Sequence, residues 1–163
     1  MTTTTGVHVP PAVRIGNCSG FYGDRLAAMR EMLTGGDLDY LTGDYLAELT
    51  MLILARDRAK SPERGYAKTF LKQLEDCLGT ALDRGVKIVA NAGGLNPAGL
   101  AAAVRALAEQ LGLSANVAHV EGDDLVSRAE EFGFGAPPAG WSEATRGTIL
   151  AANAYLGAWG IVD

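Results

Sequence analysis

The stretch Gly16-Asn17-Cys18-Ser19-Gly20-Phe21-Tyr22-Gly23-Asp24-Arg25 decides the fold of this chain. It follows the short apolar run Val13-Arg14-Ile15, which predicts a strand. The residues after it predict a helix that reaches about Leu33 and stops at Gly35-Gly36, with Asp24 as a candidate N-cap. A strand, a glycine-rich loop and a helix in this order form the unit of a parallel α/β sheet.

The same unit recurs along the chain, so we predict four strands that alternate with helices. The further strands are expected at 38–41, 86–90 and 117–120, each followed by a polar or glycine-rich loop. Asn96-Pro97 is a strong helix start, because a capping residue precedes proline at the first helical position. The pattern predicts a Rossmann-like three-layer α/β fold with a mostly parallel sheet flanked by helices.

The helices differ in how clearly the sequence marks them. A helix with Phe70, Leu74 and Leu78 on its core face is predicted to end before Gly85. An earlier helix is expected after Asp44 as N-cap, followed by a surface loop over 56–65, and a last helix is expected to start at Ser142. The apolar residues assigned to one face of the earlier helix are Leu46, Leu49, Ile53 and Leu54, and those of the last helix are Ile149, Leu150, Leu156, Trp159 and Ile161.

Composition excludes several classes of function. The 163 residues are 48% hydrophobic and carry a formal net charge of -5, with lysine and arginine scattered rather than clustered. A nucleic-acid partner is therefore not expected, whereas a small anionic substrate remains compatible. The chain has two distant cysteines and lacks both a signal-peptide pattern and an apolar run of membrane-spanning length, so we expect a cytoplasmic protein without a membrane partner.

The ends of the chain suggest how the domain is organised. Residues 1–12 are expected to form a flexible tail, and residues 13–163 a single Rossmann-like domain. The last residues, from Trp159 to Asp163, are apolar and follow no helix-stop signal. One interpretation is that this domain is the N-terminal part of a larger fold completed by another chain, which predicts a homo- or hetero-oligomer.

Polar residues follow each predicted strand, where ligands bind in open parallel sheets. Asp24, Asp44 and Ser19 are the candidate catalytic residues, although Asp24 and Asp44 are equally compatible with a purely capping role. Ser19 would need a base, for which His119 is the best candidate, and Cys18 is an alternative nucleophile or a buried core residue. The candidate substrate-binding residues are Gly16, Asn17, Gly20, Gly23, Arg25, Asn91, Gly93, Gly94 and Asn96.

Cofactors are less defined by the sequence. Glu121, Asp123 and Asp124 are a candidate divalent-metal set, although no spacing requires it. The glycines at 16, 20 and 23 do not match a dinucleotide fingerprint, and no P-loop Lys-Ser/Thr pair is present. A nicotinamide dehydrogenase is disfavoured as well, because Tyr155 is not followed by a lysine four residues later.

Four motifs resemble the AtuA-like, acyclic terpene utilisation family. They are 16–25, Leu41-Thr42-Gly43-Asp44-Tyr45-Leu46-Ala47-Glu48-Leu49-Thr50-Met51, Asn91-Ala92-Gly93-Gly94-Leu95-Asn96-Pro97 and Ala152-Asn153-Ala154-Tyr155-Leu156-Gly157-Ala158. The resemblance runs from about residue 13 to the C-terminus. It implies an enzyme or enzyme subunit that breaks down acyclic terpenoids such as citronellol and geraniol.

Within that pathway, the resemblance implies a substrate that is a small carboxylate or a branched CoA thioester, with CoA as part of the substrate. A lyase, hydratase or hydrolase reaction would suit such a molecule. The alternative is a non-catalytic binding or assembly subunit that works with a partner chain. Members of the family are longer than this chain, which agrees with a domain completed elsewhere.

Overall fold

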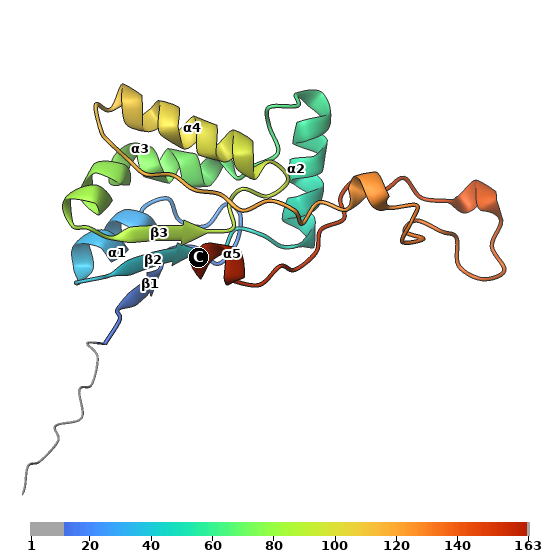
Figure 1. The fold of residues 1–163 in the computed structure, drawn as a ribbon, viewed down its shortest axis with the longest axis horizontal. Helices are drawn as coiled ribbons and strands as arrows, with labels where there is room; N and C mark the ends of the chain where they lie inside the picture. Colours follow the sequence, from blue (N-terminus) through green and yellow to red (C-terminus); the bar gives the residue numbers. More distant parts are fainter. Residues whose placement is uncertain (1–11, 163) are drawn as a thin grey trace, which may run out of the picture.

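The computed structural model describes residues 12–162 and contains one three-stranded parallel sheet with helices beside it (Figure 1). The predicted tail lies outside the described residues except for Ala12. The strands are β1 (Ile15–Asn17), β2 (Tyr40–Gly43) and β3 (Lys87–Ala90). The helices are α1 (Ala28–Gly35), α2 (Glu48–Lys60), α3 (Lys68–Asp83), α4 (Pro97–Gln110) and α5 (Trp159–Val162), with short 3₁₀ turns η1 (Val126–Arg128) and η2 (Glu143–Thr145).

The strands lie in the order β1-β2-β3, and their register separates two faces of the sheet. Gly16 pairs with Leu41 and Leu41 with Ile88, and these three positions face the helices. A Cβ atom at Gly16 would lie 2.7 Å from Cε of Met32 and 2.9 Å from Cδ1 of Leu38, so a larger residue there would require these two side chains to move. Because all three strands run parallel, the loops that leave them emerge at one edge, the carboxyl edge of the sheet.

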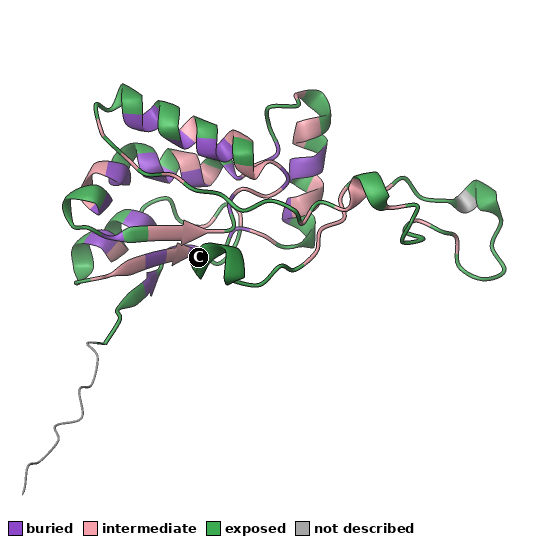
Figure 2. Cartoon of the chain, viewed as in Figure 1, coloured by how far each residue is buried: buried purple, intermediate pink, exposed green. Residues whose placement is uncertain are grey.

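The core lies between this face of the sheet and helices α1, α3 and α4. Met29 and Leu33 of α1, Leu74 and Leu78 of α3, and Val104 of α4 are buried there. Buried residues lie on the inner sides of these three helices, whereas most of the chain after α4 is exposed (Figure 2). The predicted α3 and α4 are confirmed, including the Asn96 cap, whose Oδ1 accepts from the N–H of Gly99 at 2.9 Å.

The opposite face carries fewer elements. Ile15 of β1 is 64% exposed on this face, and the Lys87 ammonium lies over the Tyr40 ring. Ile161 of α5 lines a pocket with Thr42 and Val89, which places α5 on this face near the carboxyl edge (Figure 1). The arrangement of a parallel sheet flanked by helices is consistent with the predicted three-layer α/β fold.

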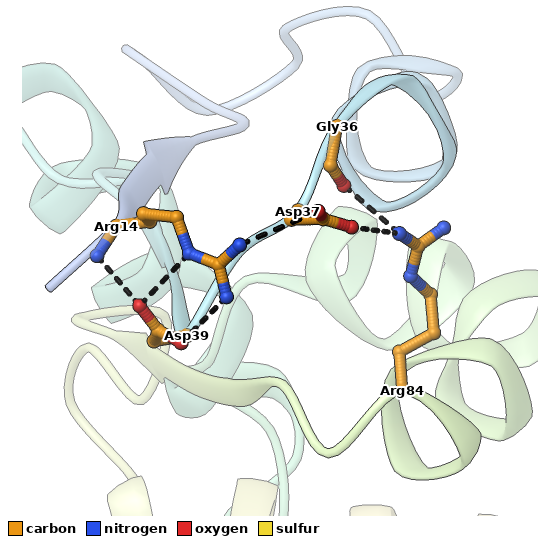
Figure 3. A network of polar contacts seen from close by, with 5 residues as sticks. All are labelled: Arg14, Gly36, Asp37, Asp39 and Arg84. Atoms are coloured by element: carbon orange, nitrogen blue, oxygen red, sulfur yellow. Dashed lines mark hydrogen bonds and ion pairs between the residues drawn. The ribbon is translucent and has the colours of Figure 1, made fainter.

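An ion-pair network closes the amino edge of the sheet (Figure 3). Asp39 accepts from the backbone N–H, Nε and Nη2 of Arg14 at 2.7, 3.2 and 3.0 Å. Asp37 contacts both Arg14 and Arg84, at 3.4 and 3.3 Å. The network joins the start of β1, the connection before β2 and the end of α3, and it lies away from the edge where the loops converge.

Two predicted elements of the C-terminal part are wrong. Residues 117–120 form no strand. The side chains of 113–117 still alternate between half-buried and exposed, as in a strand, and the Arg105 guanidinium donates to the Val117 carbonyl at 2.6 Å. The predicted last helix is reduced to η2 and α5. Asp124 and Asn153 instead form an isolated antiparallel β-bridge. This contact between residues far apart in the sequence stands where the prediction had a helix.

Helix α2 also differs from the prediction. It continues to Lys60, through half of the residues expected to form a loop, and its N-cap position is Ala47 rather than Asp44. Its buried residues are Thr50, Leu54 and Ala55, whereas Leu49 and Ile53 are exposed. Among the residues that the structure describes, no helix has the length and apolar character needed to cross a bilayer.

Candidate functional site

A pocket of about 250 Å³ lies at the carboxyl edge of the sheet, where the predicted ligand site was expected. Residues from the ends of all three strands meet in it, together with one residue of α5. The lining consists of Asn17, Thr42, Gly43, Asp44, Val89, Ala90, Asn91 and Ile161. Of the residues predicted from sequence, the pocket therefore brings together Asn17, Asp44 and Asn91.

Asp44 and Asn91 form the central polar pair of this pocket. Asn91 Nδ2 donates to Asp44 Oδ1 at 2.7 Å, and the backbone N–H of Leu46 donates to the same oxygen at 3.2 Å. Asn91 Oδ1 in turn accepts from the backbone N–H of Tyr45 at 2.8 Å. No described residue hydrogen-bonds to Oδ2 of Asp44, so one carboxylate oxygen remains available to a ligand.

Asn17 is oriented by its neighbours in the same pocket. Its Nδ2 donates to the carbonyl of Ser19 at 3.0 Å, and its Oδ1 lies 3.1 Å from the Thr42 hydroxyl. The hydroxyl can alternatively donate to the Gly16 carbonyl, also at 3.1 Å. One N–H of the Asn17 amide has no partner in this set and can donate to a bound molecule.

Below the pocket, a buried polar cluster supports Asp44 through its neighbour Tyr45. The Tyr45 hydroxyl donates to Gln73 Oε1 at 2.5 Å and lies 4.0 Å from the Cys18 thiol. Gln73 Nε2 donates to the Arg25 carbonyl at 3.3 Å. Burial raises the pKa of both Tyr45 and Cys18, so neither group is ionised near neutral pH.

Asp24 binds within the first loop rather than in the pocket. Its carboxylate accepts from the N–H of Gly20 at 3.0 Å and from that of Arg25 at 2.7 Å, and these backbone bonds hold its pKa below the usual range. It makes no cap to α1, whose N-cap position is Ala27. Two N–H groups that could bind an external anion are thus already occupied by a carboxylate of the protein.

The other predicted residues of the first loop also lie outside the pocket. Ser19 is buried, its hydroxyl donates to the Phe21 carbonyl at 3.1 Å, and His119 contacts Glu121 rather than Ser19. Arg25 forms an ion pair with Glu31 at 2.7 Å. Gly16, Gly20 and Gly23 shape the loop without lining the pocket.

The second glycine loop has a structural explanation. Gly94 adopts a φ of +53°, and a Cβ atom there would lie 2.9 Å from the Gly65 carbonyl oxygen. Gly93 lies close to Pro97, where α4 starts. Besides capping α4, Asn96 donates to the carbonyls of the segment that connects α2 with α3. These residues position the loop that starts with Asn91 and leads into α4.

The candidate metal residues do not converge. Asp123 accepts from Asn153 Nδ2 at 3.0 Å, Asp124 is paired with Arg58 at 3.1 Å, and Glu121 lies beside His119 at 3.4 Å. Within residues 12–162, no three histidine, cysteine or acidic side chains are placed to hold one metal ion. Asp123 and Asp124 instead contact distant parts of the chain, Asn153 and Arg58 of α2, whereas Glu121 contacts only its near neighbour His119.

Sequence reasoning missed the apolar half of the pocket. Val89 and Ala90 were assigned only to a strand, and Ile161 only to a helix. The alternation of β3 offered a signal, because Val89 must lie on the face opposite Ile88. No local signal could place Ile161, since its contact depends on the path of the whole C-terminal segment.

The fold and the pocket define an α/β protein with its polar site at the carboxyl edge of a parallel sheet. The model of the acyclic terpene utilisation family, described as "Acyclic terpene utilisation family protein AtuA", matches residues 13–163. The chain therefore belongs to the AtuA family, and this membership implies involvement in acyclic terpene utilisation. No curated protein and no solved structure matches the chain.

Proposed function

We propose that this chain is an enzyme, or a subunit of one, that acts on a branched acyl-CoA thioester of acyclic terpenoid catabolism. The observation that carries the proposal is the Asp44–Asn91 pair beside an apolar wall. Asp44 keeps one carboxylate oxygen free, and Val89, Ala90 and Ile161 provide apolar surface next to it. A branched hydrocarbon chain suits such a wall.

The charge of the pocket favours a thioester over a free carboxylate. Asp44 is the only charged residue in the lining. A free carboxylate would be repelled by it, whereas the carbonyl of a thioester is neutral. The volume of about 250 Å³ is below the range of about 300–1,000 Å³ that is usual for complete ligands, so the pocket would hold only the acyl end of the substrate.

Two side chains supply the chemistry in this proposal. Asp44 acts as the general base, taking a proton from the substrate or from a water molecule through its free Oδ2. The second N–H of Asn17 donates to the thioester oxygen as negative charge develops there. This pair suits a lyase, hydratase or hydrolase. Asp24 and Ser19 serve in the proposal as residues that hold the first loop in place.

Turnover of branched acyl-CoA thioesters tests the proposal. We expect Asp44→Asn to lower kcat by about 10²–10⁴-fold, which is the usual contribution of a general base. Asp24→Asn should retain most of the activity, and Glu109→Gln, an exposed change on α4, is the matched control. Equal rates for the wild type and Asp44→Asn would exclude Asp44 as the base. Absence of both turnover and binding in the wild type would overturn the proposed substrate class.

A second candidate function is a subunit that works only with a partner chain. It is favoured by aromatic residues exposed in the C-terminal segment, where Trp141 is 65%, Trp159 80% and Tyr155 fully exposed. Large exposed apolar groups often mark protein contacts. Light scattering coupled to size-exclusion chromatography tests it. A homo- or hetero-oligomer supports this function, and a stable monodisperse monomer that turns over substrate excludes it.

A further inference from the structure

A second pocket lies between the first loop, α2 and the start of α3. It has a volume of about 340 Å³ and shares no residue with the pocket at the sheet edge. Its lining consists of Tyr22, Ile53, Arg56, Asp57, Lys60 and Lys68. Helix α2 stands at the carboxyl end of the sheet next to the first residues of α3, so the pocket opens beside the loops of that edge (Figure 1).

The pocket is cationic, although the whole chain carries a formal net charge of -5. It contains three cationic side chains and one carboxylate. That carboxylate, Asp57, is engaged by Lys68 at 2.6 Å and by Arg64 at 3.5 Å. In the described part of the chain, neither Arg56 nor Lys60 has an ion pair or a hydrogen bond through its side chain, so both charges are available to a ligand.

Arg56 and Lys60 belong to one exposed face of α2. Leu49, Ile53, Arg56 and Lys60 follow each other at intervals of four, three and four residues, which places them along one side of a helix. Like charges four residues apart destabilise a helix by about 0.2–0.5 kcal/mol, and Ile53 is 40% exposed. This face therefore presents unpaired positive charge next to apolar surface, a combination that suits a ligand with an anionic group and an apolar group.

We propose that this pocket binds the phosphate group of an organic phosphate, whose carbon moiety lies against Tyr22 and Ile53. A phosphomonoester carries about -1.5 to -2 charges at neutral pH, which matches the net charge of the pocket better than a single carboxylate does. The Arg56 guanidinium can donate two parallel hydrogen bonds to phosphate oxygens, and Lys60 adds a mobile charge. The Tyr22 hydroxyl and ring offer a further donor and an apolar surface.

This binding site is independent of the chemistry proposed at the sheet edge, since the two pockets have no residue in common. Its ligand is defined by the phosphate and by a neighbouring apolar group. Binding of such a ligand would join the first loop, through Tyr22, to α2 and α3.

Titration of the full chain with hexyl phosphate, followed by calorimetry, tests the proposal. We expect saturable binding that weakens as salt is added, because the contact is between charges. Arg56→Ala and Lys60→Ala should each weaken it about tenfold or more, which corresponds to the loss of a charge-assisted hydrogen bond. Lys72→Ala, which removes an exposed charge on α3 outside the pocket, should leave the affinity unchanged.

Two further variants make the test specific. Ile53→Ser should weaken hexyl phosphate while leaving the affinity for inorganic phosphate unchanged, because only the alkyl chain contacts Ile53. Asp44→Asn should change neither affinity. The proposal is overturned if hexyl phosphate does not bind at millimolar concentration, if Arg56→Ala and Lys72→Ala bind it equally, or if Asp44→Asn alone abolishes binding.

Discussion

The side-chain amide of Asn91 joins the loops after β2 and β3, donating to Asp44 Oδ1 at 2.7 Å and accepting from the Tyr45 N–H at 2.8 Å. Both hydrogen bonds use one short side chain, so the position of Asp44 depends on the loop that starts with Asn91. Orienting groups of this kind matter in active sites, because a small misplacement of a catalytic group has a large effect on the rate.

Asn91→Ala is expected to impair both stability and the site. Loss of its hydrogen bonds should lower the free energy of unfolding by about 1–2 kcal/mol, since each is worth about 0.5–1.5 kcal/mol. Urea denaturation measures the change, and Asn116→Ala, an exposed asparagine after α4, is the matched control. If both variants unfold at the same urea concentration, Asn91 does not stabilise the connection between the two loops.

Tyr45→Phe is expected to destabilise the protein although it removes a single atom. The hydroxyl is buried and bonded to Gln73 Oε1 at 2.5 Å, so its loss leaves a buried acceptor without this donor. We expect a loss of about 1–3 kcal/mol in the free energy of unfolding, measured by thermal or urea denaturation. Tyr155→Phe should have no effect, because Tyr155 is fully exposed. A neutral Tyr45→Phe would show that water satisfies Gln73.

The cysteines are expected to be unreactive in the native protein. Cys18 and Cys77 are 3% and 1% exposed, and burial raises the pKa of both thiols. The nucleophile in thiol labelling is the thiolate, so native labelling at pH 8 should be far slower than labelling in denaturant. Mass spectrometry after iodoacetamide treatment counts the modified residues. Rapid labelling of native Cys18 would restore it as a candidate nucleophile.

Asp24 should contribute to the pH dependence of stability. Its pKa is lowered in the folded state, so its contribution is present above the pKa of the unfolded chain, about 3.9. The contribution is lost as the pH falls through the lower folded-state pKa. The stability difference between the wild type and Asp24→Asn should therefore shrink between about pH 5 and pH 2.

Denaturation curves across this pH range check the prediction for Asp24. Glu75→Gln, which removes an exposed carboxylate of α3 without a partner among the described residues, serves as the control. Its difference from the wild type should vary less with pH. A constant difference for Asp24→Asn would mean that the Gly20 and Arg25 hydrogen bonds do not depend on the charge of the carboxylate.

The sequence by itself determined the three strands of the parallel sheet and the edge at which the pocket lies, but it also predicted a fourth strand at 117–120 that the structure does not form. Glycine loops after apolar runs, the Asn96-Pro97 start of α4 and the helical spacing of Phe70, Leu74 and Leu78 are local signals, and local signals were sufficient for these elements. They also led to Asn17, Asp44 and Asn91, because residues that follow parallel strands must meet at one edge.

Tertiary structure alone decided which polar residues share a pocket and which side of α2 is buried. Asp24 and Asp44 occupy similar positions in the sequence, each in a loop after a strand. The Asp24 carboxylate accepts from N–H groups of its own loop, whereas Asp44 accepts from Asn91, which follows a strand far away along the chain. Leu49 and Ile53 fit a helical pattern, but the buried side of α2 carries Thr50 and Leu54. Leu49 and Ile53 therefore lie on its exposed side, where Ile53 lines the second pocket with Arg56. Local sequence defines the periodicity of a helix, whereas its buried face is selected by contacts with residues that lie far away along the chain.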